Sequence, residues 1–360
     1  MEKSSASKNS ILSDPILRDF FVTKDDLIFS VPDYYHPPEG IRSILRYIPD
    51  ENGSRVRKTT GIRYRKAEFF ETFAYLKKHH PDWVSDVAVV PRSEIVEILK
   101  PNDVVIEIRN NPKMNPAAFE LICRFRDAGI PVSSMGITGS ILAGLENDES
   151  DIDFLVYGND WFFAKDALKE MKNDDRGELK PFKIAELDGE MWQTVYNKRK
   201  SPFSFEDFFT HEIRKGNRGM LVSNNDDNND SGSNSDSGGK NIYFDLLFVR
   251  SNNQLPGPIQ RGIDTEKRII EAIVTNDDFA FDSPAIYLID HDEIDEIYSY
   301  THTYAGQALK GEKIRARGIV EEIDDKKRLV IGTSREAEDE WMISLSLLES
   351  WDELMSRTEE

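Results

Sequence analysis

Hydrophobic and polar positions change their period along the chain. Short apolar stretches bounded by turn residues dominate the two ends, as is typical of β-strands, and the middle mixes such stretches with helical spacing. The segments expected to be strands are 27–31, 41–48, 152–157, 219–222, 242–249, 285–289, 313–323, 328–332 and 341–345. The segments expected to be helices are 67–80, 115–129, 161–171 and 204–215, with a further helix starting near residue 141. This mixture predicts an α+β fold.

The order of these elements predicts four parts. Residues 1–15 form a disordered tail, 16–114 a basic, strand-rich α+β region, 115–256 a mixed-sheet core, and 257–360 a small antiparallel β domain with an acidic C-terminal end.

One segment of the core has no apolar residue. Ser223–Lys240 consists of Ser, Asn, Asp and Gly with a final Lys, so we expect a disordered insertion. It separates two strand-like segments that together form a hairpin, and a long insertion at a hairpin tip costs little closure entropy. Ile242–Val249 is therefore expected to be a core strand.

Composition narrows the class of protein. The chain has 66 acidic and 46 basic residues, a formal net charge of −20, which repels nucleic acid except at a local basic patch. No apolar run approaches the roughly 20 residues of a membrane span, and no signal peptide is visible, so we expect a cytoplasmic protein without membrane contact. A single cysteine excludes a cysteine-based metal cluster.

Three carboxylates stand where a metal site requires them. Asp151 and Asp153 are two residues apart at the start of an apolar strand, so both side chains point to one face. Asp245 is a lone acid in an otherwise apolar strand, where an unpaired charge is costly. Magnesium prefers such oxygen ligands. Glu186 and Asp188 are the fallback for the third ligand.

A small turn precedes the acidic pair. Gly139-Ser140 opens a helix, and Gly144 follows it. Glycine lets the backbone approach a phosphate closely, and a helix N-terminus and a serine hydroxyl can donate hydrogen bonds to it.

The stretch GITGSILAGLENDESDIDFLV resembles the signature of the polymerase-β-like nucleotidyltransferase superfamily. In that signature a Gly-Ser turn is followed by Asp-hydrophobic-Asp and by a distant third carboxylate. The whole chain more loosely resembles a group of uncharacterised archaeal proteins. The resemblance implies a nucleotidyltransferase core in which Asp151, Asp153 and Asp245 hold two Mg²⁺ ions, or Mn²⁺, and Gly139 and Ser140 bind the triphosphate.

One departure concerns the residue after Ser140. Many relatives carry Arg or Lys there, whereas this chain has Ile141-Leu142-Ala143. A basic cluster just before the hairpin of Asp245 includes Arg214, Lys215 and Arg218. It either substitutes for the missing charge in nucleotide binding, mainly through Arg214 and Lys215, or is a solvated helix face. A second cluster, within residues 42–66, is either an RNA-binding surface with interleaved tyrosines or a solvated hairpin.

We therefore expect transfer of a nucleoside monophosphate from a nucleoside triphosphate to a hydroxyl acceptor, with RNA as one candidate. Two alternatives remain at this point. One is a nucleic-acid-binding protein with a degenerate transferase site, and the other is a transferase that modifies a protein or a small molecule.

Overall fold

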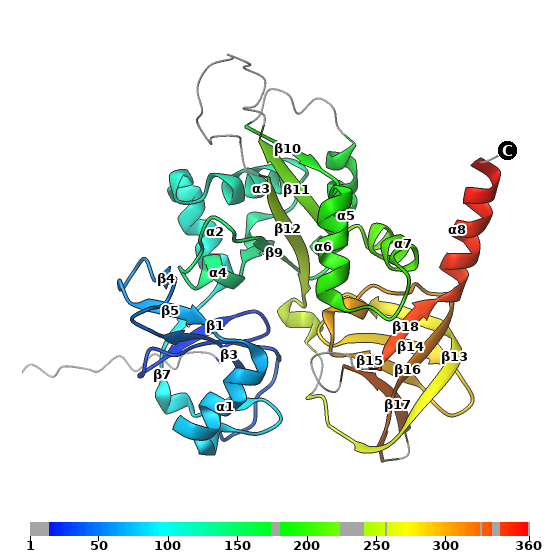
Figure 1. Cartoon of the computed structure of the whole chain (residues 1–360), viewed down its shortest axis with the longest axis horizontal. Helices are drawn as coiled ribbons and strands as arrows, with labels where there is room; N and C mark the ends of the chain where they lie inside the picture. The colour runs from blue at the N-terminus through cyan, green and yellow to red at the C-terminus, as the bar shows by residue number, and fades with distance from the viewer. Residues whose placement is uncertain are drawn as a thin grey trace, which may run out of the picture. The chain divides into compact units, whose positions relative to one another are not determined.

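A computed structural model describes residues 14–173, 181–223, 241–255, 258–324, 326–332 and 339–358. Residues 1–13 of the expected tail and 224–240 of the expected insertion lie outside these ranges. The chain divides into two compact units, Met1–Lys100 and Pro101–Glu360 (Figure 1). The first boundary lies earlier than the expected residue 114, because helix α2 (Pro101–Asn110) packs on elements of the second unit.

The N-terminal unit is built on one sheet. Within residues 14–100 seven strands pair in the order β4-β5-β3-β2-β1-β7, and β6 pairs with β3. Their bounds are β1 Phe20–Thr23, β2 Ile28–Ser30, β3 Ile41–Pro49, β4 Arg55–Val56, β5 Arg63–Lys66, β6 Ala88–Val90 and β7 Ile95–Leu99. Helix α1 (Phe69–His79) packs on β3, whose alternate residues are buried. The alternation of apolar and polar residues in β3 thus becomes one core face and one outer face.

The middle of the chain forms a five-stranded sheet in the order β10-β11-β12-β9-β8. The strands are β8 Met135–Ile137, β9 Ile152–Tyr157, β10 Phe182–Ala185, β11 Arg218–Ser223 and β12 Ile242–Val249. β9 and β12 are parallel, and the other neighbours are antiparallel. The sheet is therefore mixed, as expected.

Helices cover this sheet. They are α2, α3 (Pro116–Asp127), the one-turn α4 (Gly139–Leu142), α5 (Asp160–Lys172), α6 (Gly189–Arg199) and α7 (Phe205–Lys215). Figure 1 shows α2, α3 and α4 on one side of β9 and β12, and α6 and α7 on the other. The predicted capping residues are confirmed, since the Asn115 side chain accepts from Ala118 N–H and the Ser204 side chain from Asp207 N–H. Helices α2 and α6 were not expected from the sequence.

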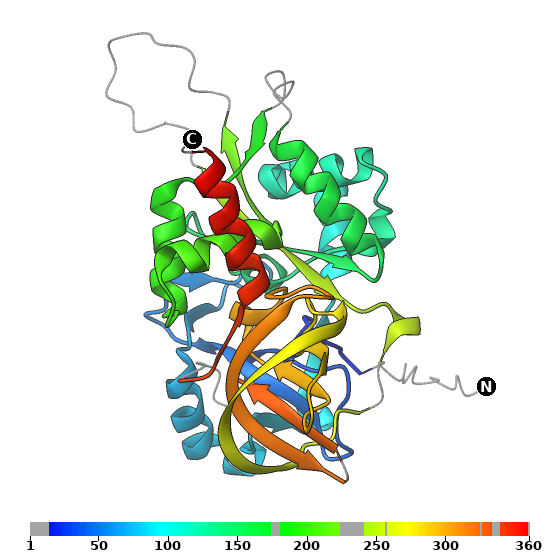
Figure 2. The ribbon, with the colours of Figure 1, turned by 90° about the vertical axis from the view of Figure 1, so that its right-hand side faces the viewer.

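The C-terminal strands close into a barrel. Among the described residues from 258 to 344 the order is β13-β14-β15-β17-β16-β18, and β13 also pairs with β16. The bounds are β13 Ile263–Phe279, β14 Ala285–Asp290, β15 Glu296–Ser299, β16 Lys313–Ile323, β17 Lys326–Ile331 and β18 Trp341–Ser344. One pair departs from the antiparallel rule, because β15 and β17 run parallel. Helix α8 (Leu345–Thr358), also not expected, follows β18 and contacts α7 (Figure 2).

Helix α7 joins the barrel to the sheet. His211 on α7 is 1% exposed, and its Nε2 accepts a hydrogen bond from the backbone N–H of Ser344 at 3.1 Å. Its Nδ1 lies 2.7 Å from the carbonyl oxygen of Asp207, to which it donates. Burial lowers the pKa of His211 to about 4. The imidazole is therefore neutral and serves as a structural link.

None of the helices in the described ranges combines the length and the apolar character needed to cross a membrane.

The buried imidazole predicts a pH dependence of stability. Folded His211 takes up a proton only near pH 4, whereas an unfolded histidine does so near 6.5, so the folded state loses stability as the pH falls through this interval. The loss approaches about 3 kcal/mol for this residue. His211→Phe should lower stability at pH 7 but flatten its slope between pH 7 and 4, as measured by urea unfolding. The exposed His79 is the control, and an unchanged slope in His211→Phe would contradict the assignment.

Candidate active site

Three charged residues share one rung of the central sheet. Asp153 on β9 is the direct partner of Asp245 on β12, and Asp245 is in turn the partner of Arg218 on β11. Directly opposed residues on neighbouring strands project from the same face of a sheet. The structure therefore brings two of the predicted carboxylates side by side, with a cation on the far side of Asp245.

The turn at Gly139 packs against this rung. Gly139 has a φ of +71°, and a Cβ built there would lie 2.1 Å from Oδ2 of Asp153. The preceding residue, Thr138, donates its backbone N–H to the carbonyl oxygen of Asp153 at 3.0 Å. Both the backbone conformation and the space beside the carboxylate thus require glycine. Ser140 follows as the second residue of α4.

Asp151 lies just before β9, which begins at Ile152. It is exposed, whereas Asp153 is half-buried and Ile152 is buried. This alternation agrees with the expectation that the two acids face one way and the isoleucine faces the core. Asp151 is therefore the acid of the pair that is open to solvent.

Asp245 is held by two neighbours. The Tyr243 hydroxyl donates a hydrogen bond to Oδ1 of Asp245 at 2.6 Å, and Arg218 Nε lies 3.0 Å from the same oxygen. Burial, followed by the charge of Asp245, raises the pKa of Tyr243 well above its usual value. The tyrosine therefore remains a donor. Among the described residues, both contacts of this carboxylate fall on Oδ1.

Arg218 belongs to a buried chain of charges. Its guanidinium pairs with Glu212, whose other oxygen accepts from Lys215 Nζ at 2.6 Å. Lys215 also donates to the carbonyl oxygen of Thr303 in the barrel at 2.7 Å. Burial would raise the pKa of Glu212, but Arg218 and Lys215 lower it to about 2. The glutamate is therefore ionised, with a cation beside each of its two oxygens.

The two basic residues expected to bind nucleotide have partners in the protein. Lys215 is 3% exposed within the chain of charges just described. Arg214 pairs with Glu312 and donates to the carbonyl oxygen of Gln307 at 2.6 Å, so its guanidinium is directed to the barrel. A triphosphate would have to displace an existing ion pair at either residue.

The absence of a basic residue after Ser140 has a packing reason. Ile141, Leu142 and Ala143 are 5%, 6% and 1% exposed, so all three side chains belong to the core. A lysine or arginine at position 141 would bury a charge in apolar surroundings in this chain.

The fallback ligands have structural roles. Glu186 accepts a hydrogen bond from Lys172 Nζ at 2.6 Å, and Asp188 caps α6 by accepting from Met191 N–H at 2.8 Å. These contacts give each of the two carboxylates a structural role that needs no metal ion.

The donor set suits a hard divalent cation. Asp153 and Asp245 offer carboxylate oxygens at adjacent positions, and magnesium usually takes one or two protein carboxylates together with phosphate oxygens and water. No group of three His, Cys, Asp or Glu in the described ranges is already arranged around a metal position. The remaining ligands would come from Asp151 or from the substrate.

The two residues that contact Asp245 were not recognised from the sequence in their observed roles. Tyr243 was not singled out, and Arg218 was grouped with residues expected to bind phosphate. One signal was present: Tyr243 and Asp245 are two apart on a strand, so they share a face. The partner of Arg218 depends on strand pairing and was not visible.

In the N-terminal unit, much of the predicted basic patch is neutralised. Its ion pairs are Arg42 with Asp33 and Asp86, Arg57 with Glu97, and Arg65 with Asp50 and Glu71. Lys58, Arg63 and Lys66 are exposed.

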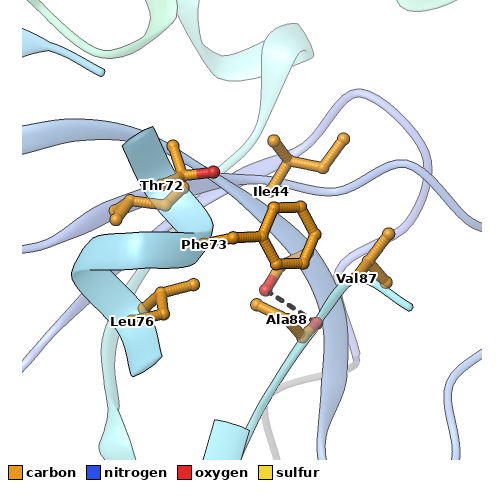
Figure 3. Close-up of a pocket in the computed structure, with 8 residues that line it drawn as sticks. Ile44, Thr72, Phe73, Leu76, Val87 and Ala88 are labelled. Carbon is orange, nitrogen blue, oxygen red and sulfur yellow. Dashed lines mark hydrogen bonds between the residues drawn. The ribbon is translucent and has the colours of Figure 1, made fainter. Parts of the chain in front are cut away.

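The same unit contains a small pocket between α1, β3 and β6. Figure 3 shows Thr72, Phe73 and Leu76 of α1 near Ile44 and Ala88. Its remaining lining residues are Ser43, Leu45 and Val87. This mainly apolar lining includes no ionisable side chain, so the pocket offers no acid–base or metal chemistry.

The contact between Gly139 and Asp153 generates a testable prediction. In Gly139→Ala the methyl group would meet a mobile carboxylate end, so Asp153 should rotate away while the fold survives. Gly129→Ala is the matched control, because Gly129 also has positive φ but has no atom near its Cβ position. Both variants should lose about 1 kcal/mol of stability from the left-handed backbone.

Only Gly139→Ala should weaken the binding of Mn²⁺, by about tenfold, in a titration followed by electron paramagnetic resonance. Equal Mn²⁺ affinity in the two variants would show that Gly139 is needed only for its left-handed backbone conformation, and not for the position of the Asp153 carboxylate.

Comparisons with known proteins agree with this geometry. The Nucleotidyltransferase domain family matches residues 118–203, which include the Gly139 turn and both acids of the pair. The uncharacterized protein MJ1086 of Methanocaldococcus jannaschii is 34% identical over 360 residues, covering 91% of this chain and 98% of that protein. No solved structure matches the chain. The chain therefore belongs to the polymerase-β-like nucleotidyltransferase superfamily, in one family with this archaeal protein.

Proposed function

We propose that this protein transfers a nucleoside monophosphate from a nucleoside triphosphate to a hydroxyl group of an acceptor. The observation that carries the proposal is the pairing of Asp153 with Asp245, with the Gly139 turn packed directly against the Asp153 carboxylate. The domain match supports nucleotidyl transfer in general.

In the proposed reaction the acceptor oxygen bonds to the α-phosphorus, and the bond from that phosphorus to the bridging oxygen breaks to release pyrophosphate. Asp151, Asp153 and Asp245 would hold two Mg²⁺ or Mn²⁺ ions. When bound, such ions neutralise the triphosphate charge and align the attacking and leaving oxygens. Asp245 would help to take the proton of the acceptor hydroxyl and pass it to water. Gly139 and Ser140 would donate hydrogen bonds to the triphosphate.

The carboxylates supply the first test of this proposal. Asp151→Asn and Asp153→Asn keep the size of the side chain but remove a charge, so pyrophosphate release should fall at least about 10³-fold, or about 4 kcal/mol of barrier. Asp245→Asn should lose turnover but keep measurable Mg–NTP binding. Melting temperatures of Asp151→Asn and Asp153→Asn should stay close to that of the wild type, because like charges no longer repel.

The control for these variants is Asp188→Asn, which alters a helix cap. Near wild-type turnover in Asp151→Asn and Asp153→Asn would refute the proposal. If the wild-type protein itself releases no pyrophosphate, the result would favour a nucleic-acid-binding protein with a degenerate transferase site.

Among the candidate acceptors, RNA is the one that an exposed basic surface of this protein could bind. The exposed residues Lys58, Arg63 and Lys66 carry charge that can contact phosphates, and the overall acidity would confine binding to such a patch.

Changing these three residues to Ala should weaken binding of single-stranded RNA and reduce the slope of log affinity against log salt by about 2. Arg42→Ala is the control, because it also removes one positive charge of the unit but at a half-buried side chain. An unchanged slope in the triple variant would point to a protein or small-molecule acceptor.

A further inference from the structure

Oδ1 of Asp245 carries both of the contacts that the carboxylate makes within the described residues. Tyr243 donates its hydroxyl to Oδ1, and Arg218 Nε approaches the same atom. A carboxylate fixed through one oxygen can present the other to a further ligand. This arrangement differs from an ion pair that uses both oxygens, which would leave neither oxygen free of a protein partner.

We propose that Arg218 and Tyr243 are positioning residues that hold Asp245 through Oδ1 and reserve Oδ2 for the divalent cation. This inference rests on the proposed function. It assigns to Arg218 a role other than the phosphate contact expected of its basic cluster.

The surroundings of Arg218 explain how it can hold this place. Its side chain is 3% exposed, and Glu212, which is 2% exposed, pairs with it from α7. Arg218 lies between two carboxylates, those of Glu212 and Asp245, so it cannot swing into solvent without breaking both ion pairs.

The charge of Arg218 has a second effect on the same site. A fixed cation 3.0 Å from Asp245 reduces the attraction of this carboxylate for a metal ion. The positioning role and the repulsive role therefore affect turnover and metal affinity in opposite directions. A residue that only supported the fold would not separate these two quantities.

Tyr243→Phe is the first test, because it removes one hydroxyl and keeps the ring. Without that donor Asp245 can rotate, so kcat should fall about tenfold and half-maximal activity should need severalfold more Mg²⁺, with KM for the nucleotide within twofold. Tyr196→Phe is the matched control, since the Tyr196 hydroxyl also donates one hydrogen bond, to the Phe203 carbonyl at 2.7 Å, in the same core cluster.

Arg218→Met is the second test, because it removes the guanidinium while Glu212 keeps Lys215 as its counter-charge. Mn²⁺ should bind severalfold more tightly in the presence of a non-hydrolysable nucleoside triphosphate, as followed by electron paramagnetic resonance, while kcat falls at least tenfold. Arg218→Lys keeps the charge but not the planar geometry, so it should retain wild-type Mn²⁺ affinity and regain part of the turnover.

The outcomes separate this inference from the function on which it rests. Loss of turnover in Asp153→Asn, together with wild-type kinetics and Mn²⁺ affinity in Tyr243→Phe and in Arg218→Met, would overturn the positioning role alone. Parallel losses of melting temperature, turnover and Mn²⁺ affinity in all variants, including Tyr196→Phe, would also overturn it. Full turnover in Asp153→Asn would instead overturn the proposed function.

Discussion

A buried carboxylate, Glu212, needs opposite charge around it, and two basic residues of the second unit supply that charge. Lys215 comes from the same helix, and Arg218 comes from the first position of β11. Removing one partner of such a buried pair costs about 3–5 kcal/mol, because the remaining charge is left uncompensated. Through Lys215 the cluster reaches the barrel at Thr303, and through Arg218 it reaches Asp245. The ion pairs of Glu212 thereby connect α7 with the barrel and with a candidate metal ligand.

Local patterns were enough to predict the elements that carry the acidic pair and the hairpin. The apolar run after Asp153 indicated a buried strand, and the polar segment between two strand-like stretches indicated that Asp245 lay on a paired strand. Caps at Asn115 and Ser204 marked the starts of α3 and α7 because their side chains satisfy free backbone N–H groups. These features depend on residues close in sequence, so the sequence alone was sufficient.

The rest depends on contacts between distant segments. A basic residue near a hairpin has the same sequence pattern whether it meets a phosphate or a buried glutamate, so the partner of Arg218 could not be predicted. Helix α6, Gly189–Arg199, contains few apolar residues and gives a weak helical period. The parallel pairing of β15 with β17 also has no local signal, because pairing direction is set by the path of the chain through the barrel.

The long strand β16 has a backbone partner along both edges. β13 pairs with one edge, while the other edge is shared by β18, along Ile314–Arg317, and β17, along Ile319–Ile323. An open strand edge is a template on which a second chain can add and aggregate. The four residues of β18 therefore act as a cover for half of this edge, and α8 begins immediately after them. A chain that ended before Trp341 would expose this edge of an otherwise closed barrel and would be prone to self-association.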